Sequence, residues 1–307
     1  MELFRNADFD FLGKKWWFIL PSLALIVAGL ASIVAQHGLL YGVDFKGGTH
    51  MEVRWDGVPP IETIRSSISA KLQGVSVVVA HDSGGSKEVL ISTALSPQEN
   101  PTAVRHTIES ALSAITARYS IRDFEAIGPQ VSEDLRHQAV MATSGASGGM
   151  LLYLAARFRL RYAVAGVLAM AHDAVITIGL FSLLHQEISL PVVAALLTLI
   201  GYSMNDTIVV FDRVRENRRM QPRDPLASVI NRSINQTLSR TVLTSGLTLL
   251  TATSLLLLGG PVLRGFSLVL VIGIIVGTFS SVYIASPILL AWEHLQFAGR
   301  AIEGRVR

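Results

Sequence analysis

Six long apolar segments restrict the fold of this sequence more than any other feature. They lie at about residues 16–36, 138–157, 162–183, 190–211, 241–258 and 266–290. A helix needs about 20 predominantly apolar residues to cross the hydrocarbon core of a bilayer. Half of the residues are hydrophobic and only 16% are charged, which lies outside the usual range of soluble domains. The sequence therefore predicts a mainly α-helical membrane protein with six transmembrane helices.

Two of these segments differ from an ordinary lipid-facing span. The first follows Lys14 and Lys15 but is longer than the apolar core of a signal peptide, so we predict a retained membrane anchor. The second begins QAVMATSGASGG, and these small and polar residues predict packing inside a helical bundle rather than contact with lipid. The pairs Gly145/Gly149 and Gly273/Gly277 have a spacing suited to close helix packing.

Basic residues are concentrated in alternate flanks of these segments. The opposite short loops, HQEISL and GGPVLR, hold only Arg264. The positive-inside rule therefore predicts that both termini and the loop RENRRMQPRD are cytoplasmic. We expect residues 1–37 to form the N-terminus and first helix, 138–294 the other five helices and 295–307 a cytoplasmic tail. Because the arginines follow every second loop, topology explains them better than nucleic-acid binding. The basic flanks include Lys14, Lys15, Arg157, Arg159, Arg161, Arg213, Arg215, Arg218, Arg219, Arg223, Arg232 and Arg240.

Residues 38–137 remain on the extracytoplasmic side and show the pattern of a folded α+β domain. THMEVRW alternates as a strand, and PIETIRSSISAKL has helical spacing. VSVVVAH and KEVLIST are two strands joined by DSGGS, a hairpin signal. A second helix is expected to open at Ser96-Pro97 with Glu99 as its capping-box acid, and SIRDFEAIG is a last strand. This β-α-β-β-α-β order predicts a ferredoxin-like domain, for which about 100 residues suffice.

The stretch YGVDFKGGTHMEV follows the first span. We interpret it as a turn that leads into a strand, with Gly47 and Gly48 at positive φ and with Asp44 and Lys46 solvated. A phosphate-binding role is weaker because neither glycine-rich phosphate motif is present.

One acidic and one basic residue lie at membrane depth in the fourth and fifth spans. Asp206, with Asn205 before it, lies about 7 Å of helix rise inside the cytoplasmic end of the fourth span, and Arg240 lies at the entry to the fifth. A buried carboxylate beside an arginine has two stable states, charged and paired or protonated and released. A static ion pair is the alternative interpretation. Asn205 is expected to orient Asp206 or to bridge to a neighbouring helix.

His172 and Asp173 lie near the middle of the third span. They are a candidate secondary proton relay or metal site, and we prefer a hydrogen-bonded packing role because no further ligand follows at suitable spacing. The chain has no cysteine, which excludes disulfides, Cys-ligated metals and thiol nucleophiles. No nucleophile–base set or cluster of metal ligands is apparent, so we expect neither an enzyme nor a metal site.

Six motifs of this sequence together resemble SecF, the protein-export membrane subunit of the SecD/SecF family. They are YGVDFKGGT, DFEAIGPQVSEDLR, AHD, GYSMNDTIVVFDRVREN, SINQTLSRT and GTFSSVYIASP, and they occur in the family's order along nearly the whole chain. YGVDFKGG and GYSMNDTIVVFDRVREN are the specific ones, whereas AHD alone is not. SecD shares the DFKGG-type motif but has a much larger extracytoplasmic region.

The resemblance implies partners and a mechanism. Members pair with SecD in an assembly similar to resistance-nodulation-division transporters, and they assist the SecYEG channel and the SecA motor in preprotein export, driven by the proton gradient without an organic cofactor. It implies a proton path through Asp206 and Arg240, and a family motif at Gly42, Asp44, Phe45, Gly47 and Gly48. Insertion factors of the YidC or YajC type are a secondary expectation. A bacterial inner-membrane location follows.

Two other functions stay open. One is a scaffold that stabilises the translocase, with Asp206 serving only helix association. The other is a small-molecule or lipid transporter of the resistance-nodulation-division type, against which the single small domain argues.

Overall fold

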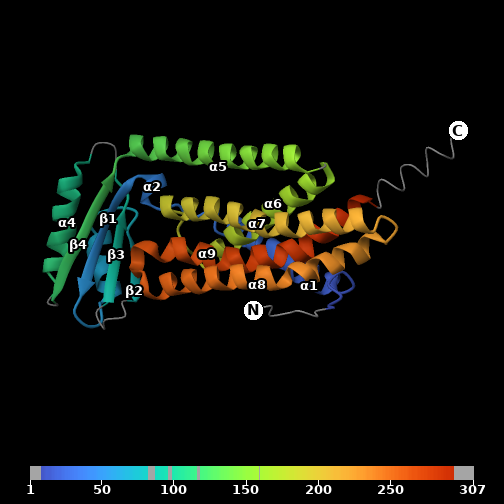
Figure 1. The fold of residues 1–307 in the computed structure, drawn as a ribbon. Coiled ribbons are helices and arrows are strands. Elements are labelled where there is room, and N and C mark those ends of the chain that lie inside the picture. The colour runs from blue at the N-terminus through green and yellow to red at the C-terminus, as the bar shows by residue number, and fades with distance from the viewer. Residues whose placement is uncertain (1–7, 82–86, 96–98, 116–117, 159, 294–307) are drawn as a thin grey trace.

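The computed structural model describes residues 8–81, 87–95, 99–115, 118–158 and 160–293. A bundle of long helices carries a small α+β unit at one end (Figure 1). Within the described residues, six helices are long and apolar enough to cross a membrane. The prediction of six spans is therefore confirmed.

The helices of the bundle extend beyond the predicted apolar segments. They are α1 Lys15–Ala35, α5 Pro129–Arg157, α6 Leu160–Leu183, α7 Leu190–Met220, α8 Leu226–Leu258 and α9 Gly260–Ser280, which a π-helical turn, Ser281–Ala285, continues. α7 has 31 residues and α8 has 33. About 20 residues suffice to span a bilayer, so the polar ends of these two helices project beyond it, at the end of the bundle away from the α+β unit (Figure 1).

The α+β unit has the predicted order of strands and helices. It comprises β1 Gly48–Trp55, α3 Ile61–Ser69, β2 Ser76–His81, β3 Lys87–Thr93, α4 Pro101–Ser113 and β4 Tyr119–Ile127, after the short helix α2 Val43–Lys46. The strands form an antiparallel sheet in the order β2-β3-β1-β4, as in a ferredoxin-like domain. The alternating residues Met51, Val53 and Trp55 are fully buried against α3 and α4. Figure 1 shows α4 on the side of the sheet away from the bundle.

The predicted start of the second helix of this unit is wrong. α4 begins at Pro101, and the side chain of Asn100 caps it by accepting a hydrogen bond from Thr102 N at 2.9 Å. Asn100-Pro101 places an N-cap residue before a proline at the first helical position, a stronger start signal than the capping box we assumed. Ser96 and Pro97, and the predicted hairpin DSGGS at 82–86, lie outside the described residues.

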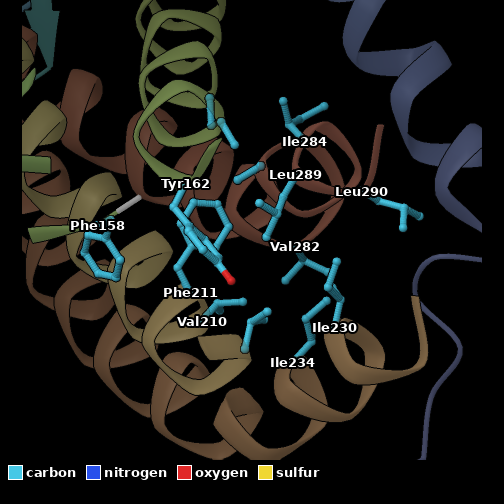
Figure 2. Close-up of a cluster of buried hydrophobic side chains, with 14 of the residues drawn as sticks. Phe158, Tyr162, Val210, Phe211, Ile230, Ile234, Val282, Ile284, Leu289 and Leu290 are labelled. Atoms are coloured by element: carbon cyan, nitrogen blue, oxygen red, sulfur yellow. The ribbon is translucent and has the colours of Figure 1, made fainter. Parts of the chain in front are cut away.

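The largest core of the bundle joins α6, α7, α8 and the π-helical turn that follows α9, with the residues after that turn. Figure 2 shows Phe158 and Tyr162 beside Val210 and Phe211, with Ile230 and Ile234 of α8 nearby. Tyr162 and Phe211 make an edge-to-face contact with ring centroids 5.5 Å apart. This core lies in the half of the bundle away from the α+β unit and fixes the relative positions of the helices that carry the candidate site.

Glycines allow the closest helix contacts in the bundle. A Cβ on Gly29 of α1 would lie 2.5 Å from the Cα of Gly179 on α6. A Cβ on Gly277 of α9 would lie 3.0 Å from the Cβ of Ser203 on α7, and one on Gly273 would overlap Leu199. The prediction of close packing at Gly273 and Gly277 is confirmed.

The prediction that the second span packs inside the bundle is wrong for this chain. Only Ser132 and Leu154 of α5 are buried, and α5 runs along one side of the bundle (Figure 1). A Cβ at Gly145 or Gly149 would meet nothing within 4 Å. The small residues of α5 thus form a face that the helices described here leave uncovered.

Candidate functional site

Asp206 is the buried acid at the centre of the candidate site. The buried positions of α7 recur with helical spacing, and Ser203, Asp206, Thr207 and Val210 share the stripe that faces the other helices. Asp206 is only 2% exposed. The hydroxyl of Ser245 on α8 donates a hydrogen bond of 2.9 Å to its Oδ2. The site therefore holds the carboxyl group between two packed helices, α7 and α8.

Arg240 lies near this carboxyl group without forming a close ion pair. It precedes Ser245 on α8 by about 7 Å of helix rise, is itself exposed, and lies near enough for its charge to act on Asp206. None of the ion pairs found among the described residues joins Asp206 to Arg240. The structure thus brings the two predicted residues into one site, with a neutral hydroxyl as the direct partner of the acid.

Asn205 lies on a different face of α7 from Asp206. Its side chain is exposed, whereas Asp206 points into the bundle. Neighbouring positions on a helix point about 100° apart, so both cannot face the same partner helix. Of the two predicted roles, Asn205 therefore does not orient Asp206 in this structure, and a bridge from its exposed amide to a neighbouring helix stays a prediction.

His172 and Asp173 belong to a hydrogen-bonded chain across three helices. Ser22 Oγ of α1 lies 2.5 Å from His172 Nε2, and His172 Nδ1 lies 2.9 Å from Asp173 Oδ1. Ser203 of α7 donates to Asp173 Oδ2. Asp173 is 2% exposed, so the preferred interpretation of a hydrogen-bonded packing role agrees with these contacts.

Serines complete both buried acid sites, and our sequence analysis missed them. Ser203 binds Asp173 and lies one helical turn from Asp206 on the same buried stripe, and Ser245 binds Asp206. The available signal was weak: each is a small hydroxyl residue inside an apolar segment. Such residues commonly bond to the backbone of their own helix, so only the packing shows which of them meet a carboxyl group.

The motif YGVDFKGG forms the junction between the α+β unit and the bundle. Gly47 and Gly48 have φ of 75° and 154°, as predicted, and they lead into β1. Gly42 and Phe45 are buried. The expectation that Asp44 is merely solvated is wrong, because its Oδ2 accepts a hydrogen bond of 2.6 Å from Leu190 N at the start of α7. The short helix α2 places this carboxylate at the first turn of α7.

No group of three or more His, Asp or Glu side chains with metal-binding geometry occurs in the part of the chain that the structure describes. The chemistry available at the site is thus that of buried carboxyl groups, hydroxyls, one imidazole and one guanidinium within a helical bundle.

These features define a class: a six-span membrane protein with buried acids in its bundle and an α+β domain attached beside the first span. Residues 107–295 match the family profile described as "Protein export membrane protein SecD/SecF, C-terminal" and residues 33–54 match "SecD/SecF GG Motif". The chain belongs to the SecD/SecF family. The second profile contains the motif that holds Asp44.

Curated relatives agree along nearly the full length. "Protein translocase subunit SecF" of Koribacter versatilis is 39% identical over 95% of this chain and 94% of its own. The protein of the same name from Magnetococcus marinus is 42% identical over 95% of both chains.

A solved structure supports the fold as well. The chain matches the crystal structure of SecDF from Thermus thermophilus with a TM-score of 0.84 and 38% identity. The match covers 96% of this chain and 40% of the SecDF chain. A SecDF structure in a "Super-membrane-facing form" matches with a TM-score of 0.71 and 39% identity, over 97% of this chain and 40% of that one. The chain therefore spans about 40% of the length of these SecDF relatives.

Proposed function

We propose that this chain is a SecF-type subunit of a bacterial protein translocase that uses the proton gradient to move its α+β domain during export. It works with a SecD partner and assists the SecYEG channel and the SecA motor on preprotein. The observation that carries the proposal is Asp206, which is almost completely buried at membrane depth, has a neutral hydroxyl as its direct partner and has Arg240 nearby.

The energetics favour a working proton site over a passive one. A charged carboxylate at membrane depth costs several kcal/mol unless it is paired or hydrated. Close approach of Arg240 would stabilise the charged form, and separation would stabilise the protonated form. One proton that crosses 100 mV gains about 2.3 kcal/mol, which shifts a conformational equilibrium about fiftyfold. One such site is therefore sufficient to bias a movement of the domain.

The hydrogen-bonded chain at Asp173 supports a secondary relay. Ser203 contacts Asp173 and lies on the same face of α7 as Asp206, one turn away. His172 connects this acid to Ser22 of α1. A proton that enters at His172 would pass through hydrogen-bonded groups as far as Ser203, and the last step to Asp206 covers one helical turn of α7. The relay needs no cofactor.

The exposed polar groups of the bundle support a SecD partner. Asn205 and Arg240 are exposed at membrane depth, and polar groups there normally face protein or a water-filled cavity. The glycine-rich face of α5 is also uncovered, and small residues favour close approach of another helix. A SecD-type half, which the fused relatives carry in the same chain, fits these uncovered surfaces. Contacts with YidC- or YajC-type factors are a secondary proposal, and nucleic acid has no part in the function.

The distribution of basic residues supports the orientation. Arginines gather where α7 leaves the bundle away from the α+β unit, as Arg213, Arg215, Arg218 and Arg219. By the positive-inside rule this end is cytoplasmic. Both termini are then cytoplasmic and the α+β domain is extracytoplasmic, in the bacterial inner membrane.

The test is protein export into inverted membrane vesicles that contain this chain and its SecD partner, with and without an imposed proton gradient. Asp206→Asn keeps the size and hydrogen-bonding capacity of the side chain but cannot titrate. We expect it to abolish the gradient-dependent part of export while the SecD complex stays intact. Asp212→Asn is the matched control, because Asp212 lies on the same helix with its side chain 54% exposed, and it should behave as wild type.

The same experiment separates the alternatives. Gradient-dependent export that survives Asp206→Asn would make the acid a structural residue and favour the scaffold. A small-molecule or lipid transporter predicts an efflux defect without an export defect.

A further inference from the structure

The motif segment between α1 and β1 is paired to the loop that starts α7. Gly42 N donates to Ile188 O at 2.9 Å, and Ile188 N donates to Leu40 O at 2.7 Å. Tyr41 and Ile188 form a parallel bridge. The backbone that enters the α+β domain therefore lies against the backbone that enters the helix of Asp206.

Asp44 adds a charged contact to this pairing. Its Oδ2 accepts a hydrogen bond of 2.6 Å from Leu190 N, the first residue of α7. The N-cap residue itself, Ser189, makes no side-chain cap bond, and Pro191 has no backbone N–H. The first turn of a helix has unsatisfied N–H groups and a partial positive charge that favours a carboxylate. Asp44 thus supplies, from 146 residues away in the sequence, the cap that the start of α7 lacks.

The segment is fixed to other elements on both sides of Asp44. Phe45 is 3% exposed and packs in a cluster with Phe181 of α6, Val192 of α7 and Val269 of α9. Arg136 of α5 donates from Nη2 to Phe45 O at 2.5 Å. The segment therefore contacts α5, α6, α7 and α9 through one short helix.

The far end of the segment is held against the sheet. A Cβ on Gly48 would lie 2.3 Å from Thr93 O of β3, so the last residue of the motif lies directly against the backbone of the neighbouring strand. β1 begins at Gly48, and Asp44 lies four residues before it. A displacement of the sheet is thus transmitted to Asp44 over a few residues, and α7 continues for about 24 Å from Leu190 to Asp206.

We propose that Asp44 is a positioning residue of the motor, which connects the α+β domain to the proton site through the N-terminus of α7. This inference rests on the proposed proton-coupled function and adds the residue through which movement of α7 reaches the α+β domain. Protonation of Asp206 changes the position of α7, and the cap transfers that change to β1. The motif then has a mechanical role in addition to forming a turn.

The lack of cysteine in the chain makes a distance measurement straightforward. Spin labels on cysteines introduced at Glu62, whose side chain is 84% exposed, and at Met220, which is 61% exposed at the far end of α7, report the position of the domain relative to that helix. Double electron–electron resonance is measured on the full chain with its SecD partner. We expect Asp44→Ala to broaden the distance distribution. The population in which the domain has separated from the start of α7 should rise about fivefold, the change that the typical loss of one helix cap produces. Asp44→Asn keeps an acceptor oxygen and should retain most of the docked population.

Export in the vesicle assay is the second readout. Asp44→Ala should lose most gradient-dependent export and keep gradient-independent export, while Asp56→Ala, at an exposed acid of the same domain, should lose neither. An unchanged distance distribution in Asp44→Ala, at normal abundance and with SecD bound, would overturn the inference. So would normal gradient-dependent export in Asp44→Ala when Asp206→Asn abolishes it. If Asp206→Asn is itself without effect, the proposed function fails, and the distance distribution still decides whether Asp44 holds the domain to α7.

Discussion

The hydroxyl of Ser245 on α8 donates a hydrogen bond of 2.9 Å to Oδ2 of Asp206 on α7. Both residues are buried, so the bond joins two long helices inside the bundle. A carboxyl group next to a hydroxyl keeps its hydrogen bond whether or not it carries a proton, because the hydroxyl can donate or accept. Ser245 thus allows Asp206 to change its charge without loss of its neighbour.

The contribution of this bond can be measured by a double-mutant cycle. We expect Ser245→Ala to destabilise the protein by about 1–3 kcal/mol, since it leaves a buried carboxyl group without its donor. The same substitution in an Asp206→Ala background should cost much less. Thermal unfolding of the purified SecD complex gives all four values, and a coupling energy of about 1–2 kcal/mol is expected. Strictly additive values would show that the two side chains do not interact.

Arg240→Ala should uncouple export from the gradient while leaving assembly intact. The side chain of Arg240 is exposed, so its removal costs little packing, but the charge near Asp206 is lost. Export in vesicles should fall to the level observed without a gradient. The matched control is Arg232→Ala on the same helix, whose partner Asp224 lies 3.5 Å away, and it should keep gradient-dependent export. Normal stimulation in Arg240→Ala at normal abundance would remove the arginine from the mechanism.

The contact between Gly29 and Gly179 should be intolerant of any side chain. A Cβ on Gly179 would lie 2.9 Å from the Cα of Gly29, and backbone atoms cannot move aside as a flexible side chain can. We expect Gly179→Ala to destabilise the bundle by about 1–3 kcal/mol, the usual cost of overpacking. Gly246→Ala on α8 has open space within 4 Å and should be neutral or stabilising by up to about 1 kcal/mol. Equal melting temperatures of the two variants in detergent would contradict this prediction.

The sheet should become more stable as the pH falls towards the pKa of Glu52. Burial raises the pKa of Glu52 above its ordinary value of 4.5, and the nearby charges of Glu88, Asp123 and Glu125 raise it further, against a smaller effect of Arg122. Between 4.5 and the raised pKa, the native state therefore binds a proton that the unfolded state has lost. Stability falls as pH rises through that window and recovers as pH is lowered.

Hydrogen-exchange protection of β1 in the full chain measures this effect. Glu52→Gln should increase the protection of β1 at neutral pH. It should also remove the pH dependence of that protection between pH 4.5 and the raised pKa of Glu52. Glu62→Gln, at an exposed side chain of α3, should leave the pH dependence as in wild type. A pH dependence of β1 protection that is the same in Glu52→Gln and wild type would assign it to other groups.

Sequence patterns anticipated the elements well and their contacts poorly. The spacing of Met51, Val53 and Trp55 predicted a half-buried strand, and β1 buries all three, because alternation is a local property of an extended chain. The start of α4 was misplaced because two cap signals lay close together and only one of them, Asn100, caps the helix. Asp206 was identified because a charged carboxylate is energetically costly at membrane depth. Its partner Ser245 was not identified, since many hydroxyl residues lie in the apolar segments.

The sequence by itself determined that the chain crosses a membrane six times, that an α+β domain lies between the first two spans and that Asp206 is buried among apolar residues. Each of these depends on hydrophobic burial or on backbone periodicity, which neighbouring residues decide. Only the tertiary structure decided that Asp206 meets Ser245, 39 residues away, that Asp44 caps α7, 146 residues away, and that Asn205 and the glycines of α5 stay uncovered. Contacts over such separations follow from how whole helices pack, and a sequence pattern that extends over a few turns carries no record of that packing.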